Sequence, residues 1–167
     1  QIELVAGAFS SDPKKAALSG KDFFIDSSKV YSSYKEMAQK EGALPLGERI
    51  DFASIVVRNH LHFEVAKTFL EAGINVICDK PATFTLAEAR ELKKIIHKSK
   101  KVFALTHNYT GYPMVKLARQ MVKKRELGEI IKVVCEYPQG YAITALTGED
   151  NSIANWRADP KLAGISN

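Results

Sequence analysis

Residues 76–81 read Val-Ile-Cys-Asp-Lys-Pro, an apolar run that ends in an acid, a lysine and a proline. In open parallel α/β sheets, ligands bind in the crevice beyond the carboxyl ends of the strands. A lysine at such an end can meet a reacting hydroxyl group, so Lys80 is the first candidate for a functional residue. The alternative is that Lys80 only leads the chain into solvent before Pro81 ends the strand pairing.

Around this stretch the sequence alternates between apolar runs and helical patterns. Near-continuous apolar strands separated by single helices favour a parallel sheet, because such a sheet is buried on both faces. We therefore predict an α/β fold with a doubly wound parallel sheet and helices on both faces. The predicted strands span residues 2–9, 52–57, 75–78 and 102–106, and the predicted helices span residues 13–18, 34–42, 61–72, 86–96 and 113–127.

Local signals support several of these helices. Ser-x-x-Glu at residues 33–36 and Thr-x-x-Glu at residues 85–88 have the form of capping boxes. Pro113 suits the first turn of a helix. Apolar side chains recur on one face of that helix, which we interpret as core packing: Met114, Leu117, Ala118, Met121 and Val122.

The pattern changes after Gly128. Residues 130–137 predict a strand, but no clear helix follows it, and the remaining tail indicates a loop that holds Trp156. We therefore predict one domain over residues 1–128 and the beginning of a second over residues 129–167.

Composition excludes several classes of function. The 167 residues are 46% hydrophobic and 26% charged, without a signal peptide or an apolar run long enough to cross a bilayer, so we expect a cytoplasmic protein. The net charge of +5 comes from lysines dispersed among helix ends without interleaved aromatic residues, so we expect no nucleic-acid binding. Cys78 and Cys135 lack metal-ligand spacing, and we interpret both as small buried residues with no metal site.

Several motifs together resemble the Gfo/Idh/MocA family of oxidoreductases, named after glucose-fructose oxidoreductase and inositol dehydrogenase. The motifs lie at residues 6–13 (Ala-Gly-Ala-Phe-Ser-Ser-Asp-Pro), 56–62 (Val-Val-Arg-Asn-His-Leu-His), 78–81 (Cys-Asp-Lys-Pro), 106–109 (Thr-His-Asn-Tyr) and 156–160 (Trp-Arg-Ala-Asp-Pro). The resemblance implies a Rossmann domain followed by an α+β domain with an open, mainly antiparallel sheet. It also implies NAD or NADP as cofactor, a carbohydrate-like substrate and a homo-oligomer.

The sequence departs from the family pattern at both ends. The family's first strand with its Gly-x-Gly-x-x-Gly turn would precede residue 1, and its Asp-x-Gly-x-His segment would follow residue 167. We therefore expect a fragment that is inactive by itself, with activity in the full-length protein. In the Rossmann strand order the missing strand would lie between the strands at 2–9 and 52–57. We expect a neighbouring chain or an upstream segment to fill that gap, or the two strands to pair directly, the least favoured arrangement.

The resemblance assigns roles residue by residue. Lys80 corresponds to the family lysine that positions the substrate hydroxyl and relays its proton, so it is predicted to be catalytic and to contact both substrate and cofactor. Asp79 stands where the family has glutamate more often; we predict a cofactor contact, or a carboxylate that only caps the turn. Asn59 is predicted to contact the cofactor or to cap a helix. His62 is predicted to contact the cofactor or to lie on a helix surface.

Further candidates lie at other strand ends. Ser10 and Ser11 stand where NAD-selective Rossmann domains often place an acid, and a serine pair can accept a 2′-phosphate or form an ordinary polar turn. Asn108 is predicted to bind cofactor. Tyr109, Trp156 and Arg157 are predicted to bind substrate, with a hydrophobic anchor as the alternative for Trp156. His97 is expected to be a surface residue.

Two functions remain open from the sequence. The first is an NAD(P)-dependent oxidoreductase that moves a hydride between nicotinamide and a sugar, cyclitol or related polyol carbon. The alternative is a non-catalytic module that binds nucleotides or sugar derivatives on the same scaffold, because a fold alone does not define an activity.

Overall fold

The structure is a computed structural model that describes residues 2–138 and residue 161. The chain divides into two compact units, residues 1–105 and residues 106–167. In the part of the chain that the structure describes, no helix is long and apolar enough to span a bilayer.

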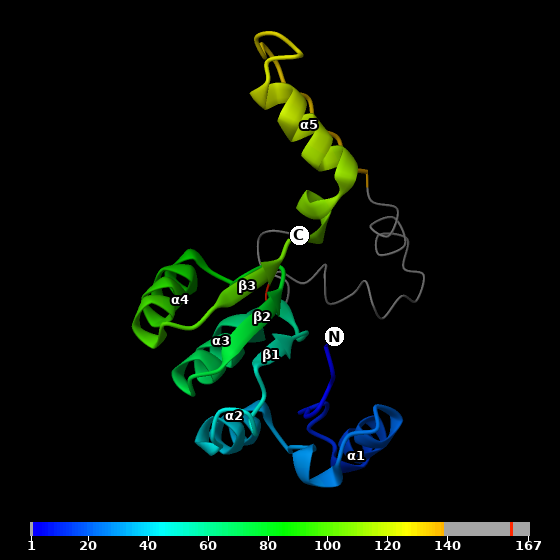
Figure 1. The fold of residues 1–167 in the computed structure, drawn as a ribbon, viewed down its shortest axis with the longest axis vertical. Helices are drawn as coiled ribbons and strands as arrows, with labels where there is room; N and C mark the ends of the chain where they lie inside the picture. Colours follow the sequence, from blue (N-terminus) through cyan, green and yellow to red (C-terminus); the bar gives the residue numbers. More distant parts are fainter. Residues whose placement is uncertain (1, 139–160, 162–167) are drawn as a thin grey trace. The chain divides into compact units, whose positions relative to one another are not determined.

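A three-stranded parallel sheet is the centre of the first unit (Figure 1). It consists of β1 (Phe52–Ile55), β2 (Asn75–Asp79) and β3 (Phe103–Thr106), in that spatial order. β1 and β2 are parallel, with Ile55 opposite Cys78 at their carboxyl ends. The predicted α/β class and the three strands after residue 50 are therefore confirmed, although β1 is shorter than the predicted run.

The side chain of Asn75 joins the starts of all three strands. Its Nδ2 donates to the carbonyl oxygen of Asp51 at 2.9 Å, and its Oδ1 accepts from the amide of Val102 at 3.1 Å. Asp51 directly precedes β1, and Val102 directly precedes β3. The amino ends of the outer strands are thus tied to one residue of the central strand.

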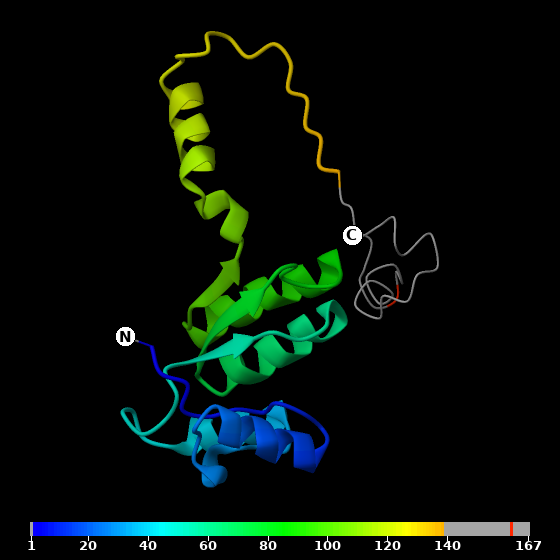
Figure 2. The same cartoon turned by 90° about the vertical axis from the view of Figure 1, so that its right-hand side faces the viewer.

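Two helices pack side by side on one face of this sheet (Figures 1 and 2). They are α3 (His62–Glu71), which connects β1 to β2, and α4 (Leu86–Ser99), which connects β2 to β3. Ala53 and Val76 face this side and are buried, whereas Ser54 on the alternate face is exposed. The prediction of complete burial on both faces is therefore wrong at β1, because consecutive right-handed crossovers place their helices on the same side.

Residues 2–9 form no strand, contrary to prediction. Gly7 makes one isolated parallel bridge with Val30, through its amide to the Lys29 carbonyl at 3.0 Å and its carbonyl to the Tyr31 amide at 2.9 Å. Leu4 is 52% exposed. An apolar run becomes a strand only where a partner pairs along its length. Direct pairing of residues 2–9 with β1 is also wrong, since β1 is an end strand of the three-stranded sheet.

Helix starts follow the local capping signals, whereas the predicted end of the first helix at residue 18 is wrong, because α1 continues to Asp22. α1 (Pro13–Asp22) begins after Asp12, whose carboxylate accepts from the amide of Lys14 at 2.9 Å, and η1 (Ser27–Lys29) follows. α4 begins with the complete capping box that Thr85 and Glu88 predict. At α2 (Tyr34–Ala43) the box is only half formed, as described next.

The capping residue of α2 is Ser33, whose hydroxyl accepts from the amide of Glu36 at 3.2 Å. The Glu36 carboxylate accepts from the amide of Ser32 at 3.0 Å instead of closing the reciprocal bond to Ser33. The helix start is thus confirmed, while the predicted second half of its cap is shifted by one residue.

The second unit contains η3 (Asn108–Gly111) and α5 (Pro113–Lys123). Residues 130–137 are exposed and form no strand, so that prediction is wrong. The apolar stripe of α5 is not core in the described structure, since Met114 is 71% exposed. Both predictions needed a partner surface, which a periodic pattern does not supply. The predicted domain boundary at residue 128 stays a prediction.

Candidate functional site

Lys80 follows the last residue of β2 at the carboxyl edge of the parallel sheet, and its side chain is exposed. Its peptide bond to Pro81 is cis. The amide of Lys80 donates to Oδ1 of Asp79 at 2.9 Å, so the Asp79 carboxylate does cap the turn, as one of its two alternatives proposed. An ammonium group therefore stands at the sheet edge where α/β proteins bind ligands.

Asn59 lies on the neighbouring connection, at the start of η2 (Asn59–Leu61), and is 6% exposed. Arg58 precedes η2 and Leu61 precedes α3, and neither of these two residues caps its helix through its side chain. The predicted capping role of Asn59 stays a prediction. The predicted contact of Asn59 with a cofactor stays a prediction.

His62, the first residue of α3, is 1% exposed. Its Nδ1 lies 2.5 Å from the carbonyl oxygen of Pro81, and its Nε2 lies 3.0 Å from the carbonyl oxygen of Val57. The alternative of a helix-surface histidine is therefore wrong. The ring connects the segment after β1 with the segment after β2, which brings Asn59, His62, Asp79 and Lys80 into one region.

Two features of this region leave no signal in the sequence. The acceptors of His62 are backbone carbonyl groups, which residue identity does not reveal. The other feature is Nδ1 of His60, which is buried and has no hydrogen-bond partner among the described residues. The Asn-x-x-His spacing indicated the correct loop, but it did not indicate the contacts that the histidine ring nitrogens make.

Ser10 and Ser11 line a separate cavity of about 400 Å³ in the first unit. Lys21, Ser27 and Ser32 contribute further polar side chains to it. The amide of Asp12 donates to the Ser10 hydroxyl oxygen at 3.1 Å, which shows that the polar turn is formed. The volume is in the usual range for small-molecule sites, and hydroxyl groups with one ammonium group suit a ribose or a phosphate.

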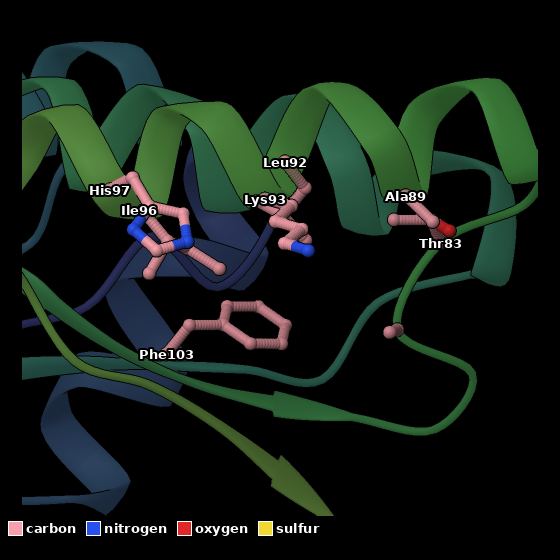
Figure 3. Close-up of a pocket in the computed structure, with 8 residues that line it drawn as sticks. Thr83, Ala89, Leu92, Lys93, Ile96, His97 and Phe103 are labelled. Atoms are coloured by element: carbon pink, nitrogen blue, oxygen red, sulfur yellow. The ribbon is translucent and has the colours of Figure 1, made fainter.

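A smaller apolar hollow lies between α4 and β3 (Figure 3). Phe103 of β3 faces Leu92 and Ile96 of α4 across it, and Lys93 and His97 stand at its edge. Ala82 and Thr83, which follow the Lys80-Pro81 turn, and Ala89 of α4 complete the lining. His97 is exposed, as predicted.

The remaining candidates belong to the second unit or lie outside the described residues. Asn108 and Tyr109 are exposed residues of η3 in the second unit. The Tyr109 ring lies 5.4 Å from the ring of Tyr112, and its hydroxyl oxygen lies 3.4 Å from that of Tyr137. Trp156 and Arg157 lie outside the described residues. All four assignments stay predictions.

The two cysteines differ from each other. Cys78 in β2 is fully buried, as predicted, whereas Cys135 is exposed, so the prediction for Cys135 is wrong. Its apolar neighbours suggested a buried strand, and that strand does not form. Among residues 2–138 and 161, no cluster of three His, Cys, Asp or Glu side chains could hold a metal ion.

A parallel α/β sheet with Asp79 and Lys80 at the carboxyl end of a strand has the arrangement in which α/β proteins bind ligands. Residues 2–107 match the sequence pattern of the Gfo/Idh/MocA family, described as an oxidoreductase family with an NAD-binding Rossmann fold. The chain belongs to this family.

Individual relatives agree with this membership. The chain is 34% identical to the uncharacterized oxidoreductase YfiI of Bacillus subtilis over 99% of its own length and 42% of that protein. It is 30% identical to levoglucosan dehydrogenase of Pseudarthrobacter phenanthrenivorans over 69% of its length and 28% of that enzyme. The chain thus spans less than half of these curated relatives.

A solved structure gives the same result. An inositol dehydrogenase homologue of Azotobacter vinelandii, crystallised with NAD+, matches 98% of this chain and 41% of that one, with 35% identity and a TM-score of 0.88. The same homologue in complex with NADH and myo-inositol matches 78% of this chain and 34% of that one, at 35% identity and a TM-score of 0.73.

Proposed function

We propose that the full-length protein is an NAD(P)-dependent oxidoreductase that acts on a CH–OH group of a sugar, cyclitol or related polyol. The observation that carries this proposal is the exposed side chain of Lys80 directly after the carboxyl end of β2, where its amide is bonded to the Asp79 carboxylate. Family membership supports the cofactor class, and the myo-inositol complex of the Azotobacter vinelandii homologue supports the substrate class.

The described residues fit part of a dinucleotide. The cavity beside Ser10 and Ser11 offers hydroxyl groups and the Lys21 ammonium group, which are suited to ribose or phosphate oxygens. We propose that these residues hold the adenosine end and that Asn59, Asp79 and Asn108 contribute to the nicotinamide end. A bound NAD or NADP would supply the hydride acceptor or donor.

Lys80 carries the proton chemistry in this proposal. When a hydroxyl group is oxidised, its proton must leave as the hydride departs from the carbon. In its uncharged form, Nζ of Lys80 would accept the hydroxyl proton as the hydride leaves. The ammonium group so formed would stabilise the negative charge that develops on the oxygen and return the proton to water. Tyr109, Trp156 and Arg157 are proposed to orient the remaining hydroxyl groups of the substrate.

The test is a Lys80→Ala substitution in the full-length protein, assayed with NAD and NADP against a panel of sugars and inositols. Turnover should fall by roughly a hundredfold or more, the scale of a lost acid–base group, and should fall far more than cofactor affinity does. Lys94→Ala, which removes an exposed lysine of α4, is the matched control and should retain full activity. Equal turnover in Lys80→Ala and the unaltered protein would reject the assignment.

The alternative function gives a different result in the same experiment. A non-catalytic binding module would bind cofactor or sugar without any change in nicotinamide absorbance across the whole panel. Size-exclusion chromatography of the full-length protein tests the proposed homo-oligomer separately.

A further inference from the structure

The segments that leave β1 and β2 are joined by the side chain of His62. Val57 lies two residues beyond β1, and Pro81 lies two residues beyond β2. One fully buried imidazole ring reaches the carbonyl oxygens of both, at 3.0 Å from Nε2 and 2.5 Å from Nδ1. This ring therefore links the two strand ends on which the candidate site is built.

Both partners of the ring are hydrogen-bond acceptors. A neutral imidazole has one N–H group and can donate to one of the two carbonyl groups, while a protonated ring can donate to both. In either form the ring holds at least one carbonyl by a hydrogen bond. Loss of that donor would leave a partly buried carbonyl group without this partner.

His62 gives the Lys80-Pro81 turn a contact with an element outside the turn. Pro81 has no amide hydrogen, so its own backbone can be anchored only through the carbonyl group. The amide of Lys80 is bonded to the preceding side chain, Asp79, within the same turn. The contact from Nδ1 of His62 to the Pro81 carbonyl thus connects the turn to α3, an element outside the turn.

We propose that His62 is a positioning residue for Lys80, one that fixes the backbone of the lysine turn against α3 and the end of β1. This inference rests on the proposed role of Lys80. It gives His62 a task different from the cofactor contact that the sequence predicted. A reacting group displaced by about 1 Å can lose roughly a hundredfold in rate, so a fixed turn matters for the exposed Lys80 side chain.

The first test does not depend on activity. Hydrogen–deuterium exchange of the full-length protein is compared between the unaltered form and His62→Gln, which keeps one amide donor, and His62→Leu, which keeps none. The amides of Lys80 and Ala82 should exchange about tenfold faster in His62→Leu, with a smaller change in His62→Gln, while amides in α4 keep their rates. Unchanged exchange at the turn in both variants would overturn the proposal.

The second test is a double-substitution cycle on turnover. His62→Leu alone should lower kcat by about tenfold or more with little change in KM, and should add no further loss in a Lys80→Ala background. His97→Leu, the same substitution at an exposed histidine of α4, is the control and should leave kcat unchanged. Equal losses in both backgrounds would show a purely structural role and overturn the proposal.

The two proposals fail in different ways. If Lys80→Ala keeps full turnover but exchange at the turn still rises in the His62 variants, the catalytic role of Lys80 fails and the contact stands. If Lys80→Ala loses turnover but neither His62 variant changes exchange or kcat, only the positioning role fails. If His62→Leu does not fold, His62→Gln takes its place in the cycle, and failure of both to fold would assign His62 to the core and overturn the positioning role.

Discussion

The phenol group of Tyr31 donates a hydrogen bond to Oε1 of Glu41 at 2.5 Å, inside the core of the first unit. The same carboxylate accepts from Nζ of Lys29 at 2.8 Å and, through Oε2, from the amide of Ile50 at 3.0 Å. Lys29 and Tyr31 flank the residue that bridges Gly7, and Ile50 comes two residues before β1. Glu41 therefore joins the amino-terminal segment to the start of the sheet.

We expect the stability of the chain to fall in acid because of Glu41. Burial by itself would raise the pKa of this carboxyl, but hydrogen bonds from Lys29, Tyr31 and Ile50 lower it below its usual value of 4.5. The unfolded state then binds more protons than the folded state as the pH falls. The contribution is therefore complete above about pH 4.5 and is lost as the pH falls through the lower folded pKa.

Glu41→Gln should remove this acid dependence. At neutral pH it should lower the free energy of unfolding by about 2 kcal/mol, because the buried ion pair and its hydrogen bonds lose their charged acceptor. Urea unfolding at pH 7 and pH 4 measures both effects. Glu71→Gln, at an exposed carboxylate at the end of α3, should retain the slope of the unaltered chain. The same slope in Glu41→Gln would contradict the prediction.

Gly42→Ala should destabilise the chain, although alanine is the better helix former. A Cβ atom on Gly42 would lie 2.9 Å from the carbonyl oxygen of Ala72, at the end of α3, so α2 and α3 would have to separate. Overpacking of this kind costs about 1–3 kcal/mol, more than the helix propensity gained. Thermal unfolding provides the measurement. Gly111→Ala meets open space and serves as control; a Gly42→Ala chain that melts no earlier would refute the close packing.

The two thiol groups should react at very different rates. Burial in β2, with a smaller effect of the Asp79 charge, raises the pKa of Cys78 to about 12, whereas Cys135 is exposed. Because the thiolate is the reactive form, Cys78 should react at least about a hundredfold more slowly with a thiol reagent in the folded chain. Cys135→Ser should abolish the fast phase, and addition of urea should restore reaction at Cys78. A fast phase that persists in Cys135→Ser would disprove the burial of Cys78.

The sequence predicted those parts of the fold that depend on residues close together in the sequence. The Thr85 and Glu88 pair marked the start of α4, and the apolar run from Asn75 marked β2 with its lysine turn. Each of these signals acts within one turn or one strand, so the chemistry of a few side chains is sufficient. Lys80 was placed correctly at a strand end for the same reason.

The parts that depend on a partner could not be predicted in this way. Residues 2–9 and 130–137 have strand-like composition, but a strand also needs a second strand beside it. Cys135 was expected to be buried because it lies in the strand that was wrongly predicted at residues 130–137. His62 was assigned to a motif correctly, yet its backbone acceptors come from two loops that only the folded chain brings together.

Asn75 offers a prediction at the edge of the sheet opposite the candidate site. Asn75→Asp keeps the size of the side chain but removes the Nδ2 donor to the Asp51 carbonyl. It should lower the free energy of unfolding by about 1 kcal/mol, the usual value of one hydrogen bond. Denaturant unfolding measures it. Asn108→Asp, at an exposed residue of η3, should change it little; an equal loss in both variants would argue against the bridge.

The side-chain amide of Asn75 also affects the position of the strand ends at the opposite edge of the sheet. Its hydrogen bonds connect the residues that precede β1 and β3 to the first residue of β2, so the three strands begin in register. The length of each strand then determines where it ends. A slip of one residue would displace the end of β2 by about 3.3 Å and turn Cys78 out of the core. The position of Lys80 along the strand direction thus depends on Asn75, an uncharged residue at the opposite end of β2.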